Sequence, residues 1–521
     1  MSSPALSPEL SEKNKKYDRQ LRLWGEHGQS LLEAAQLCLV NVTAFGTEIL
    51  KNIVLPGIGG FTIVDSGIVT EEDVGCNFFF DSNSIGQLKA KCSMQLLQEM
   101  NPDVSSDYLD ESIETILSNN PEFFNSFKVV IASSLKEKTL IMLSRLLWTK
   151  NIAFVYCRSI GFIAMTRLQF KEHAVVETHP DNKQWDLRLE QPFESLEKYL
   201  NSVELNHKVP WIVVVYKFLQ KWQNETGLKI PTNYKEKCAL KEMIQSAITK
   251  EEENYEEAVK AINSCFGGGK PNSILLDILN DPACVNLTKN SNIFWILVRS
   301  VKDFMEHDND NFVPLAGIIT DMTADTDNYI NLQNVYRQKA LNDADSVYKR
   351  AQQHLQELGL SNDLITDKDV KLFCREFTSI SLLRGSCIAD EYEKPPVSVI
   401  ASEIEAGTSS AMSIYVALRA LNKFESEHGT SPGEIYVESD TARIKSIACK
   451  FLNEWGILTP FSDEWAHELC RYGGAEIHSV SAFMGGCIAQ EIIKLITKQY
   501  KPINNTFIYN AITSETAVFK L

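Results

Sequence analysis

The sequence predicts an α/β fold, in which a doubly wound, Rossmann-like half is interrupted by a large, mainly α-helical insertion. Two observations support this prediction. Short apolar runs alternate with amphipathic stretches over the first part of the chain, and the same alternation returns near the C-terminal end. Between them, long charged stretches with helical spacing dominate. Strands that alternate with helices are typical of a mostly parallel sheet that carries helices on both faces.

The first part of the chain contains the predicted sheet. Four short apolar runs are predicted as buried strands: Leu37–Val42, Phe61–Asp65, Val129–Ala132 and Ala153–Cys157. Three stretches between them place apolar residues at helical spacing and are predicted as helices: Glu48–Leu55, Gly86–Met100 and Leu140–Trp148. The first of these helices ends at Pro56-Gly57, and the second must stop before Pro102, because a proline disfavours the helical backbone in the residue that precedes it.

The middle of the chain is predicted to be helical. Its amphipathic stretches are Val213–Trp222, Tyr234–Thr249, Glu251–Asn263, Tyr329–Leu358 and Ser413–His428. The α/β pattern returns with an apolar helix over Ala482–Thr497 and a strand over Asn504–Tyr509. The predicted organisation is a flexible leader (1–16), the first part of the α/β domain (17–170), the helical insertion (171–470) and a return to the α/β domain (471–521).

Composition excludes several classes of protein. The formal net charge of -17 argues against a nucleic-acid-binding protein, which needs a basic face. No apolar run is long enough to cross a bilayer, and residues 1–16 lack the apolar core of a signal peptide. Twelve cysteines without any Cys-x-x-Cys pair predict neither a zinc site nor a disulfide framework. A reducing location is expected, cytoplasmic or nuclear, with peripheral membrane association left open.

The stretch Tyr17–Gly25 (YDRQLRLWG) resembles the opening signature of the ubiquitin-activating enzyme family. The helix that follows the first predicted strand carries Glu48, Lys51 and Asn52 in the family's order Glu-x-x-Lys-Asn. The resemblance implies that the Rossmann-like half is an adenylation half, in which a strand enters a glycine-rich turn that holds ATP.

The glycine-rich turn is degenerate in this chain. Active members carry G-x-G-G-x-G, because glycines let the backbone approach a nucleotide and the helix N-terminus presents free N–H groups to phosphate. Here the four glycine positions read Asn41, Thr43, Ala44 and Gly46. Side chains at the first three would crowd or bend the turn, so no nucleotide is expected to bind this chain. Gly46 either contacts a nucleotide or only lets the helix pack on the sheet.

Charged positions of active members are also replaced. Asp65-Ser66-Gly67 lacks the second acid of an Asp-x-Asp pair, Cys76 stands where an arginine would neutralise phosphate, and Ala132–Leu135 lacks a magnesium-binding aspartate. Lys89 matches a retained lysine, which is either a phosphate contact or a solvated surface side chain. Phosphoryl chemistry depends on such charges and on metal. We therefore expect no catalysis, no bound cofactor and no metal in this chain.

Further strings, taken in order, resemble the regulatory, non-catalytic subunits of the heterodimers that activate Nedd-type modifiers. These strings are His179–Asn182, Pro210–Val213, Tyr234–Lys237, Phe294–Leu297, Leu332–Arg337, Cys470–Gly473 and Ala489–Glu491. The resemblance implies an obligate catalytic partner that binds ATP and magnesium, adenylates a ubiquitin-like modifier and carries the thioester cysteine. It also suggests the tail of the amyloid precursor protein as a further partner.

The resemblance implies that two groups of residues in this chain contact the catalytic partner. Arg19 would reach into the partner's ATP site, since a guanidinium fits phosphate in a forked geometry; the alternative is an ion pair with Asp18 or a nearby acid. The second group would face the catalytic subunit, or alternatively form the solvated start of an ordinary helix. Its members are Ala324, Tyr329, Leu332, Gln333, Val335, Tyr336 and Arg337.

Other functions stay open at this point. The chain could serve a different ubiquitin-like modifier, although the regulatory subunit of the SUMO type lacks so long an insertion. It could be a self-sufficient ATP-dependent activating enzyme, or a Rossmann-type oxidoreductase with residues 41–46 as its dinucleotide cradle. The lost glycines count against both of the latter.

Overall fold

The computed structural model describes residues 15–180, 185–248, 252–405 and 411–521. Nearly all of the predicted leader lies outside these residues, as do Asp181 and Asn182 and the predicted helix ends at Thr249 and Glu251. The chain divides into two compact units: unit 1 comprises residues up to 175 together with 383–521, and unit 2 comprises residues 176–382.

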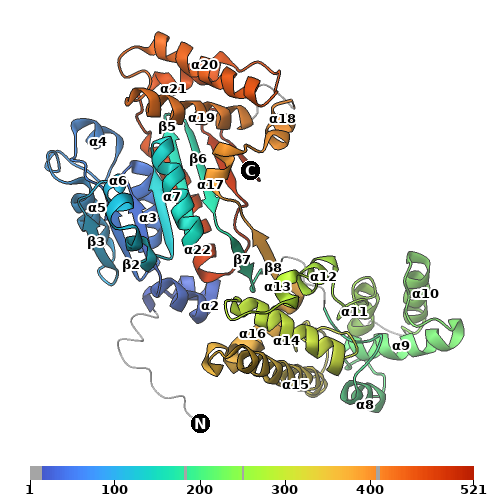
Figure 1. The fold of residues 1–521 in the computed structure, drawn as a ribbon. Coiled ribbons are helices and arrows are strands. Elements are labelled where there is room, and N and C mark those ends of the chain that lie inside the picture. The colour runs from blue at the N-terminus through green and yellow to red at the C-terminus, as the bar shows by residue number, and fades with distance from the viewer. Residues whose placement is uncertain (1–14, 181–184, 249–251, 406–410) are drawn as a thin grey trace. The chain divides into compact units, whose positions relative to one another are not determined.

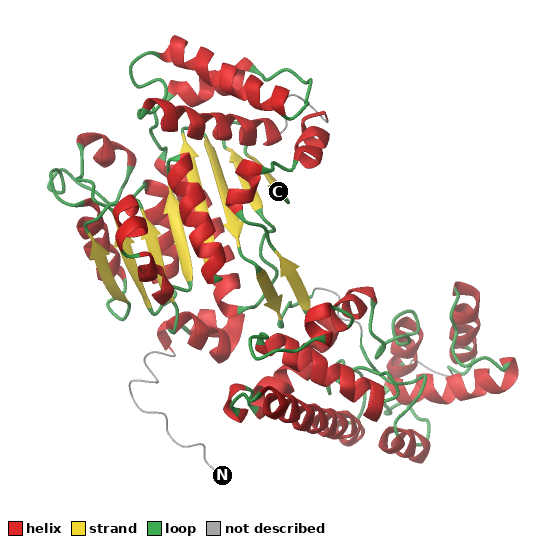
Figure 2. Ribbon diagram, in the orientation of Figure 1, coloured by secondary structure: helices red, strands yellow, loops and turns green. Residues whose placement is uncertain are grey.

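Unit 1 is built on an eight-stranded sheet in the order β10-β9-β6-β5-β4-β1-β2-β3, seen in yellow in Figure 2. Its strands are β1 (Gln36–Val40), β2 (Gly60–Val64), β3 (Ser105–Leu109), β4 (Val129–Ser133), β5 (Ala153–Ile160), β6 (Ile163–Gln169), β9 (Thr506–Asn510) and β10 (Glu515–Phe519). The five strands from β3 to β5 are parallel, whereas β6, β9 and β10 extend the sheet antiparallel. The order β3-β2-β1-β4-β5 is that of a doubly wound sheet, and the predicted fold class is confirmed.

Helices cover both faces of this sheet (Figures 1 and 2). One apolar core holds Leu37 and Leu39 of β1 with residues of α3 (Ala44–Val54) and α22 (His478–Thr497). The other core holds Cys38 and Val40 with residues of α7 (Glu137–Lys150). Successive side chains of a strand point to opposite faces, so β1 feeds both cores. The remaining helices of the first part are α2 (Asp18–Glu33), α4 (Glu71–Cys76), α5 (Lys89–Met100), α6 (Ile113–Asn119) and the short 3₁₀ helix Pro121–Ser126.

The chain returns to unit 1 much earlier than predicted. Residues 383–470, which the sequence assigned to the insertion, form α17 (Ile388–Glu393), α18 (Val397–Glu405), α19 (Ala411–His428), α20 (Val437–Glu454) and α21 (Asp463–Arg471). Leu421 and Phe424 of α19 lie in the same apolar core as Phe154 and Tyr156 of β5. Their packing on the sheet moves the end of the insertion from residue 470 to residue 382.

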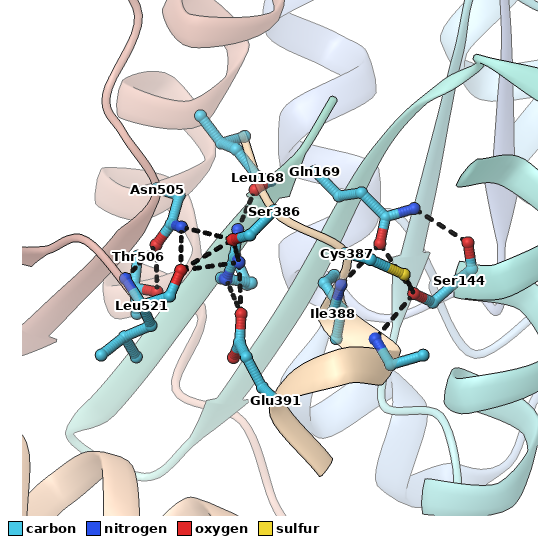
Figure 3. A network of polar contacts seen from close by, with 12 residues as sticks. Ser144, Leu168, Gln169, Ser386, Cys387, Ile388, Glu391, Asn505, Thr506 and Leu521 are labelled. Carbon is cyan, nitrogen blue, oxygen red and sulfur yellow. Dashed lines mark hydrogen bonds and ion pairs between the residues drawn. The ribbon is translucent and has the colours of Figure 1, made fainter. Parts of the chain in front are cut away.

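A buried polar network fixes this return, as the left half of Figure 3 shows. Arg167 on β6 forms an ion pair with Glu391 on α17, and its Nη2 donates to Ser386 Oγ at 2.6 Å. Ser386 Oγ in turn donates to the carbonyl of Leu521 at 2.7 Å and accepts from Asn505 Nδ2 at 3.0 Å. A buried charge needs partners of this kind, and here they come from residues 386–391 and from Leu521, both far from Arg167 in the chain.

A second group of bonds, on the right of Figure 3, fixes the N-terminus of α17. The N–H of Ile388 donates to Gln169 Oε1 at 2.8 Å, and the N–H of Ala389 donates to Ser144 Oγ at 3.0 Å. Ser144 Oγ also donates to Gln169 Oε1 at 2.7 Å. Two side chains of α7 and β6 therefore satisfy N–H groups that a helix start leaves without intrahelical partners.

Unit 2 is helical, as the sequence predicts for the middle of the chain. Its α-helices are α8 (Glu194–Ser202), α9 (Trp211–Thr226), α10 (Tyr234–Gln245), α11 (Glu253–Ala261), α12 (Ser273–Leu279), α13 (Pro282–Val285), α14 (Ile293–Asp308), α15 (Thr326–Leu358) and α16 (Asp367–Glu376). Leu240 of α10 and both Leu332 and Tyr336 of α15 lie in one apolar core with α9. A separate two-stranded sheet pairs β7 (Glu172–Val175) with β8 (Ser381–Arg384), where the chain passes from one unit to the other.

One helix within the described residues, α22, has the length and apolar character that a membrane span requires. Of its most apolar stretch, 67% is buried inside the structure. Ile488, Ile492 and Ile496 lie in the core that α22 shares with α3 and the sheet. This burial accounts for the apolar composition of α22 as that of a core helix.

Candidate functional site

The candidate site lies where the parallel sheet changes its direction of winding. β1 pairs with β2 on one side and with β4 on the other, and doubly wound sheets bind ligands at the carboxyl ends of strands at such a point. The turn after β1 meets the end of β4 here, because Asn41 Nδ2 donates to the carbonyl of Ser133 at 3.1 Å. Residues 41–46, called the cradle below, therefore lie where a nucleotide would be expected.

The first replaced glycine position keeps a glycine-like backbone. Asn41 has a φ of 63°, in the left-handed region that glycine favours and that asparagine tolerates better than most residues. Its N–H donates to the carbonyl of Val64 at 3.0 Å and so continues the pairing of β1 with β2. The turn keeps this bend without a glycine, and the Asn41 side chain joins the end of β1 to the end of β4.

Other polar groups of the cradle are satisfied within the chain. Thr43 is the N-cap of α3, and its Oγ1 accepts from the N–H of Gly46 at 3.1 Å. The carboxylate of Asp65, just after β2, accepts from the N–H of Val42 and from that of Gly67, each at 2.6 Å. The turn is thus held by its own side chains.

Gly46 is explained by packing. A Cβ atom at this position would lie 2.8 Å from Leu39 Cδ1 and 2.8 Å from Ser133 Oγ. Both atoms belong to strands that α3 covers, so only glycine lets α3 approach the sheet this closely. This contact supports the second of the two explanations that the sequence left open.

The N-terminus of α3 holds a carboxyl group from the far end of the chain. Glu476 Oε2 accepts from the N–H of Ala44 at 2.6 Å and from that of Phe45 at 3.4 Å. Glu476 forms an isolated β-bridge with Gly161, whose N–H donates to the carbonyl of Ala475 at 2.9 Å. Helix N-termini attract anions through their free N–H groups and the helix dipole. The place of a phosphate is therefore filled by a side chain.

Burial governs the charge of this group. Desolvation raises the pKa of the Glu476 carboxyl to about 7, against the opposing effect of the two N–H groups and of the positive charges of Arg158 and Lys89. Both cations also have partners of their own: Lys89 Nζ lies 2.7 Å from Asp73 Oδ1, and Arg158 forms a buried ion pair with Glu425. Lys89, which matches a lysine of active members, is thus paired with a carboxylate.

Uncharged groups fill the other replaced positions. Burial raises the pKa of the Cys76 thiol, which lies near Glu476 and stands where active members place an arginine. At the end of β4, near the place of the acid of active members, Ser133 Oγ donates to the carbonyl of Asn41 at 3.4 Å. Within the described residues, no group of three or more His, Cys, Asp or Glu side chains could hold a metal ion.

The cysteines of residues 171–470 lie mostly in the interior. Cys265, Cys284, Cys374, Cys387 and Cys470 are buried, and Cys238 and Cys449 are half-buried. Burial raises the pKa of Cys265 to about 12 and that of Cys284 to about 11. Because the thiolate is the nucleophile, such burial disfavours thioester chemistry at these two positions.

Arg19 is exposed in the first turn of α2. The alternative of an ion pair with Asp18 is not what the structure shows, because Asp18 pairs with Arg22, whose Nε lies 2.9 Å from its Oδ2. Within the described part of the chain, no ion pair or hydrogen bond of the Arg19 side chain is found. The guanidinium is therefore available at the surface of unit 1.

The predicted partner-facing residues 324–337 divide into two sets. Leu332 and Tyr336 are fully buried in the core of unit 2, where the Tyr336 hydroxyl donates to the carbonyl of Leu187 at 2.6 Å. Gln333 and Arg337 are exposed, and Ala324, Tyr329 and Val335 are half-buried. Leu332 and Tyr336 hold α15 in place from inside, so they offer no surface to a partner.

A groove of about 730 Å³ lies beside α5, away from the cradle residues. It is lined by residues of the loop before α5, of α5 itself and of the turn after it: Phe78, Phe79, Phe80, Asp81, Asn83, Ser84, Gln87, Cys92, Gln95, Leu96, Gln98, Glu99 and Pro102. None of residues 41–46 lines it. The groove is therefore a surface feature separate from the cradle.

The sequence interpretation missed Glu476. Only its position offered a signal, as an acid between Gly473-Gly474 and the last helix. Its partner Ala44 is 432 residues away in the chain. No local pattern connects two groups so far apart.

Comparisons with known proteins cover the whole described chain. The model of the ThiF family matches residues 17–521. The Nedd8-activating enzyme E1 regulatory subunit of Drosophila melanogaster is 54% identical over 524 residues, which is 100% of each chain. The protein of the same name in Xenopus laevis is 45% identical, over 98% of this chain and 99% of its own. NEDD8-activating enzyme E1 regulatory subunit AXR1 of Arabidopsis thaliana is 36% identical, over 99% and 97%.

Proposed function

Since the chain belongs to the ThiF family and, within it, to the NEDD8-activating enzyme E1 regulatory subunits, we propose that it is the non-catalytic half of a heterodimer that activates a NEDD8-type modifier. In this proposal the catalytic partner binds ATP and magnesium, adenylates the modifier and carries the thioester. This chain provides the matching half of the adenylation core, and its location is the cytoplasm or the nucleus.

The filled cradle is the observation that carries the proposal. The N–H groups of Ala44 and Phe45 are bonded to Glu476, and the retained Lys89 is bonded to Asp73. A nucleotide in this cradle would have to displace the half-buried Glu476 side chain and would meet neither a free arginine nor a magnesium-binding acid. We therefore assign nucleotide binding to the partner.

We further propose that Arg19 acts in trans, in the partner's ATP site. Its exposure and its lack of an ion pair in the described chain support this role, because a guanidinium already engaged with Asp18 would have to be released first. A charge-assisted, forked contact to phosphate contributes most where charge develops during adenylation.

The exposed side of α15 is the second proposed partner surface. Gln333 and Arg337 lie one turn apart on this helix and are exposed, in contrast to Leu332 and Tyr336. The tail of the amyloid precursor protein stays a prediction of the sequence resemblance alone.

The test is a matched pair of arginine variants co-expressed with the catalytic partner. Arg19→Ala is expected to slow modifier-dependent exchange of pyrophosphate into ATP by about tenfold to a hundredfold, the effect of removing one charge-assisted hydrogen bond. Arg22→Ala, on the same helix, removes an exposed pair and is expected to leave the rate unchanged. Both variants are expected to elute as heterodimers in size-exclusion chromatography.

Three outcomes would count against the proposal. Exchange rates that are equal for Arg19→Ala and wild type would exclude the role in trans. Exchange of pyrophosphate into ATP by this chain without its partner would instead favour a self-sufficient activating enzyme. Thioester formation with ubiquitin or a SUMO-type modifier in place of NEDD8 would identify a different branch of the family.

A further inference from the structure

The start of α3 leaves no helical N–H group free for a phosphate. Of its first three N–H groups, those of Ala44 and Phe45 are bonded to Glu476, and that of Gly46 is bonded to the Thr43 side chain. The next, that of Thr47, donates to the carbonyl of Thr43 at 3.0 Å. A helix N-terminus binds anions only through such groups, and here every one of them has an internal partner.

Glu476 is built into this position by its backbone. The β-bridge between Glu476 and Gly161 requires glycine at position 161. A Cβ atom at this position, where φ is +52°, would lie 2.1 Å from the ring of Tyr472. The turn before Glu476 is closed by the N–H of Ala475, which donates to the carbonyl of Tyr472 at 2.9 Å. The segment 472–476 therefore lies against the end of β5, and it places the carboxyl group of Glu476 at the N-terminus of α3.

The environment of the carboxyl group is that of an anion site. Glu476 Oε1 is buried and has no hydrogen-bond partner among the described residues, although the residue as a whole keeps some exposed surface. Arg158 and Lys89 act on the group with positive charge. If the side chain were shortened, the N–H groups of Ala44 and Phe45 would face the vacated space, with Arg158 and Lys89 nearby even though each is also paired with a carboxylate. That combination is what a phosphate oxygen requires.

We propose that Glu476 is an internal ligand of the cradle, which occupies the position of a nucleotide phosphate at the N-terminus of α3 and closes a latent phosphate-binding site. The inference rests on the proposed function in one respect, namely that ATP belongs to the partner. It adds a reason why this half does not compete for nucleotide. Shortening one side chain is then sufficient to restore binding of inorganic phosphate, without restoring any lost glycine.

The experiment measures the Tm of the full chain by thermal unfolding over a series of phosphate concentrations. The pH is 8, and chloride keeps the ionic strength constant. Glu476→Ala vacates the site, and Glu476→Ser vacates it but keeps a small hydrogen-bonding group. The Tm of both variants is expected to rise as phosphate is added. Their apparent dissociation constant for phosphate is expected to be about tenfold lower than that of wild type, as the charge effect of a helix N-terminus predicts. Glu476→Gln keeps the shape of the side chain and is expected to respond as wild type does.

The outcomes separate the explanations. If phosphate stabilises the wild-type chain as strongly as it stabilises Glu476→Ala, the cradle is open in the wild type and the proposal is overturned. The absence of any gain over wild type in both shortened variants would overturn it as well. Because the titration involves no adenylation, its result is independent of the Arg19→Ala test, so the two proposals can fail separately.

Discussion

The raised pKa of Glu476 makes a prediction about stability and pH. The variant Glu476→Gln replaces the carboxyl group by an amide of nearly the same shape that does not titrate. The carboxyl pKa moves from 4.5 to about 7 on folding, because burial disfavours its charged form. Between these two pH values the folded chain binds more protons at this position than the unfolded chain does.

The sign and size of the effect follow from this difference. Stability falls with rising pH wherever the folded state binds more protons, so the contribution of Glu476 is fully present below about pH 4.5 and is lost as pH rises through about 7. At 1.36 kcal/mol per pKa unit, the shift corresponds to about 3 kcal/mol between pH 4.5 and 8. The surrounding titratable groups, Arg158, Lys89 and Cys76, are common to both proteins, so they largely cancel in the comparison.

Urea unfolding of wild type and Glu476→Gln at a series of pH values from 5 to 8 measures this difference. The free energy of unfolding of the variant, relative to wild type, is expected to rise by about 2–3 kcal/mol over this range. Parallel pH profiles for the two proteins would refute the reasoning, since they would show that the carboxyl group is not desolvated in the cradle.

Two further predictions concern packing and the buried network. Gly46→Ala is expected to destabilise unit 1 by about 1–3 kcal/mol, because its Cβ would lie 2.8 Å from Leu39 and Ser133; Gly486→Ala, in α22 with open space around it, is expected to stabilise by about 0.5–1 kcal/mol. Urea midpoints of the two variants that move in the same direction would contradict this. Glu391→Ala leaves Arg167 buried and unpaired and is expected to cost about 3–5 kcal/mol in thermal or urea unfolding, whereas Glu393→Ala, from an exposed pair on the same helix, is expected to cost less than about 1 kcal/mol. Equal losses would show that burial does not set the cost.

Four of the five parallel strands were predictable from local pattern, whereas β3, which begins with Ser105, Ser106 and Asp107 and is no apolar run, was missed. The apolar runs at 37–42, 61–65, 129–132 and 153–157 correspond to β1, β2, β4 and β5, within a few residues at their ends. β6 was missed, because its buried residues include Arg167 and Gln169, which a pattern of apolar residues does not reveal. Their partners come from residues 386–391 and from α7, so the polarity of β6 makes sense only once these segments are in contact.

The end of the helical insertion was not predictable for a related reason. The helices between 388 and 471 are amphipathic in the same way as those of unit 2, and amphipathicity indicates that a helix packs but not what it packs against. Leu421 and Phe424 of α19 lie in the same apolar core as Phe154 and Tyr156 of β5, and unit 1 resumes at residue 383.

The sequence by itself determined that the cradle lacks the glycines and charges of the family's nucleotide site, because three glycine positions and several charged positions are replaced within short motifs. Only the tertiary structure decided which side chain lies at the N-terminus of α3. Glu476 bonds to Ala44, which is 432 residues away in the chain. The β-bridge between Glu476 and Gly161, at the end of β5, holds Glu476 in this position. Hydrogen bonds between such distant segments depend on how the chain packs and leave no periodic trace in the sequence.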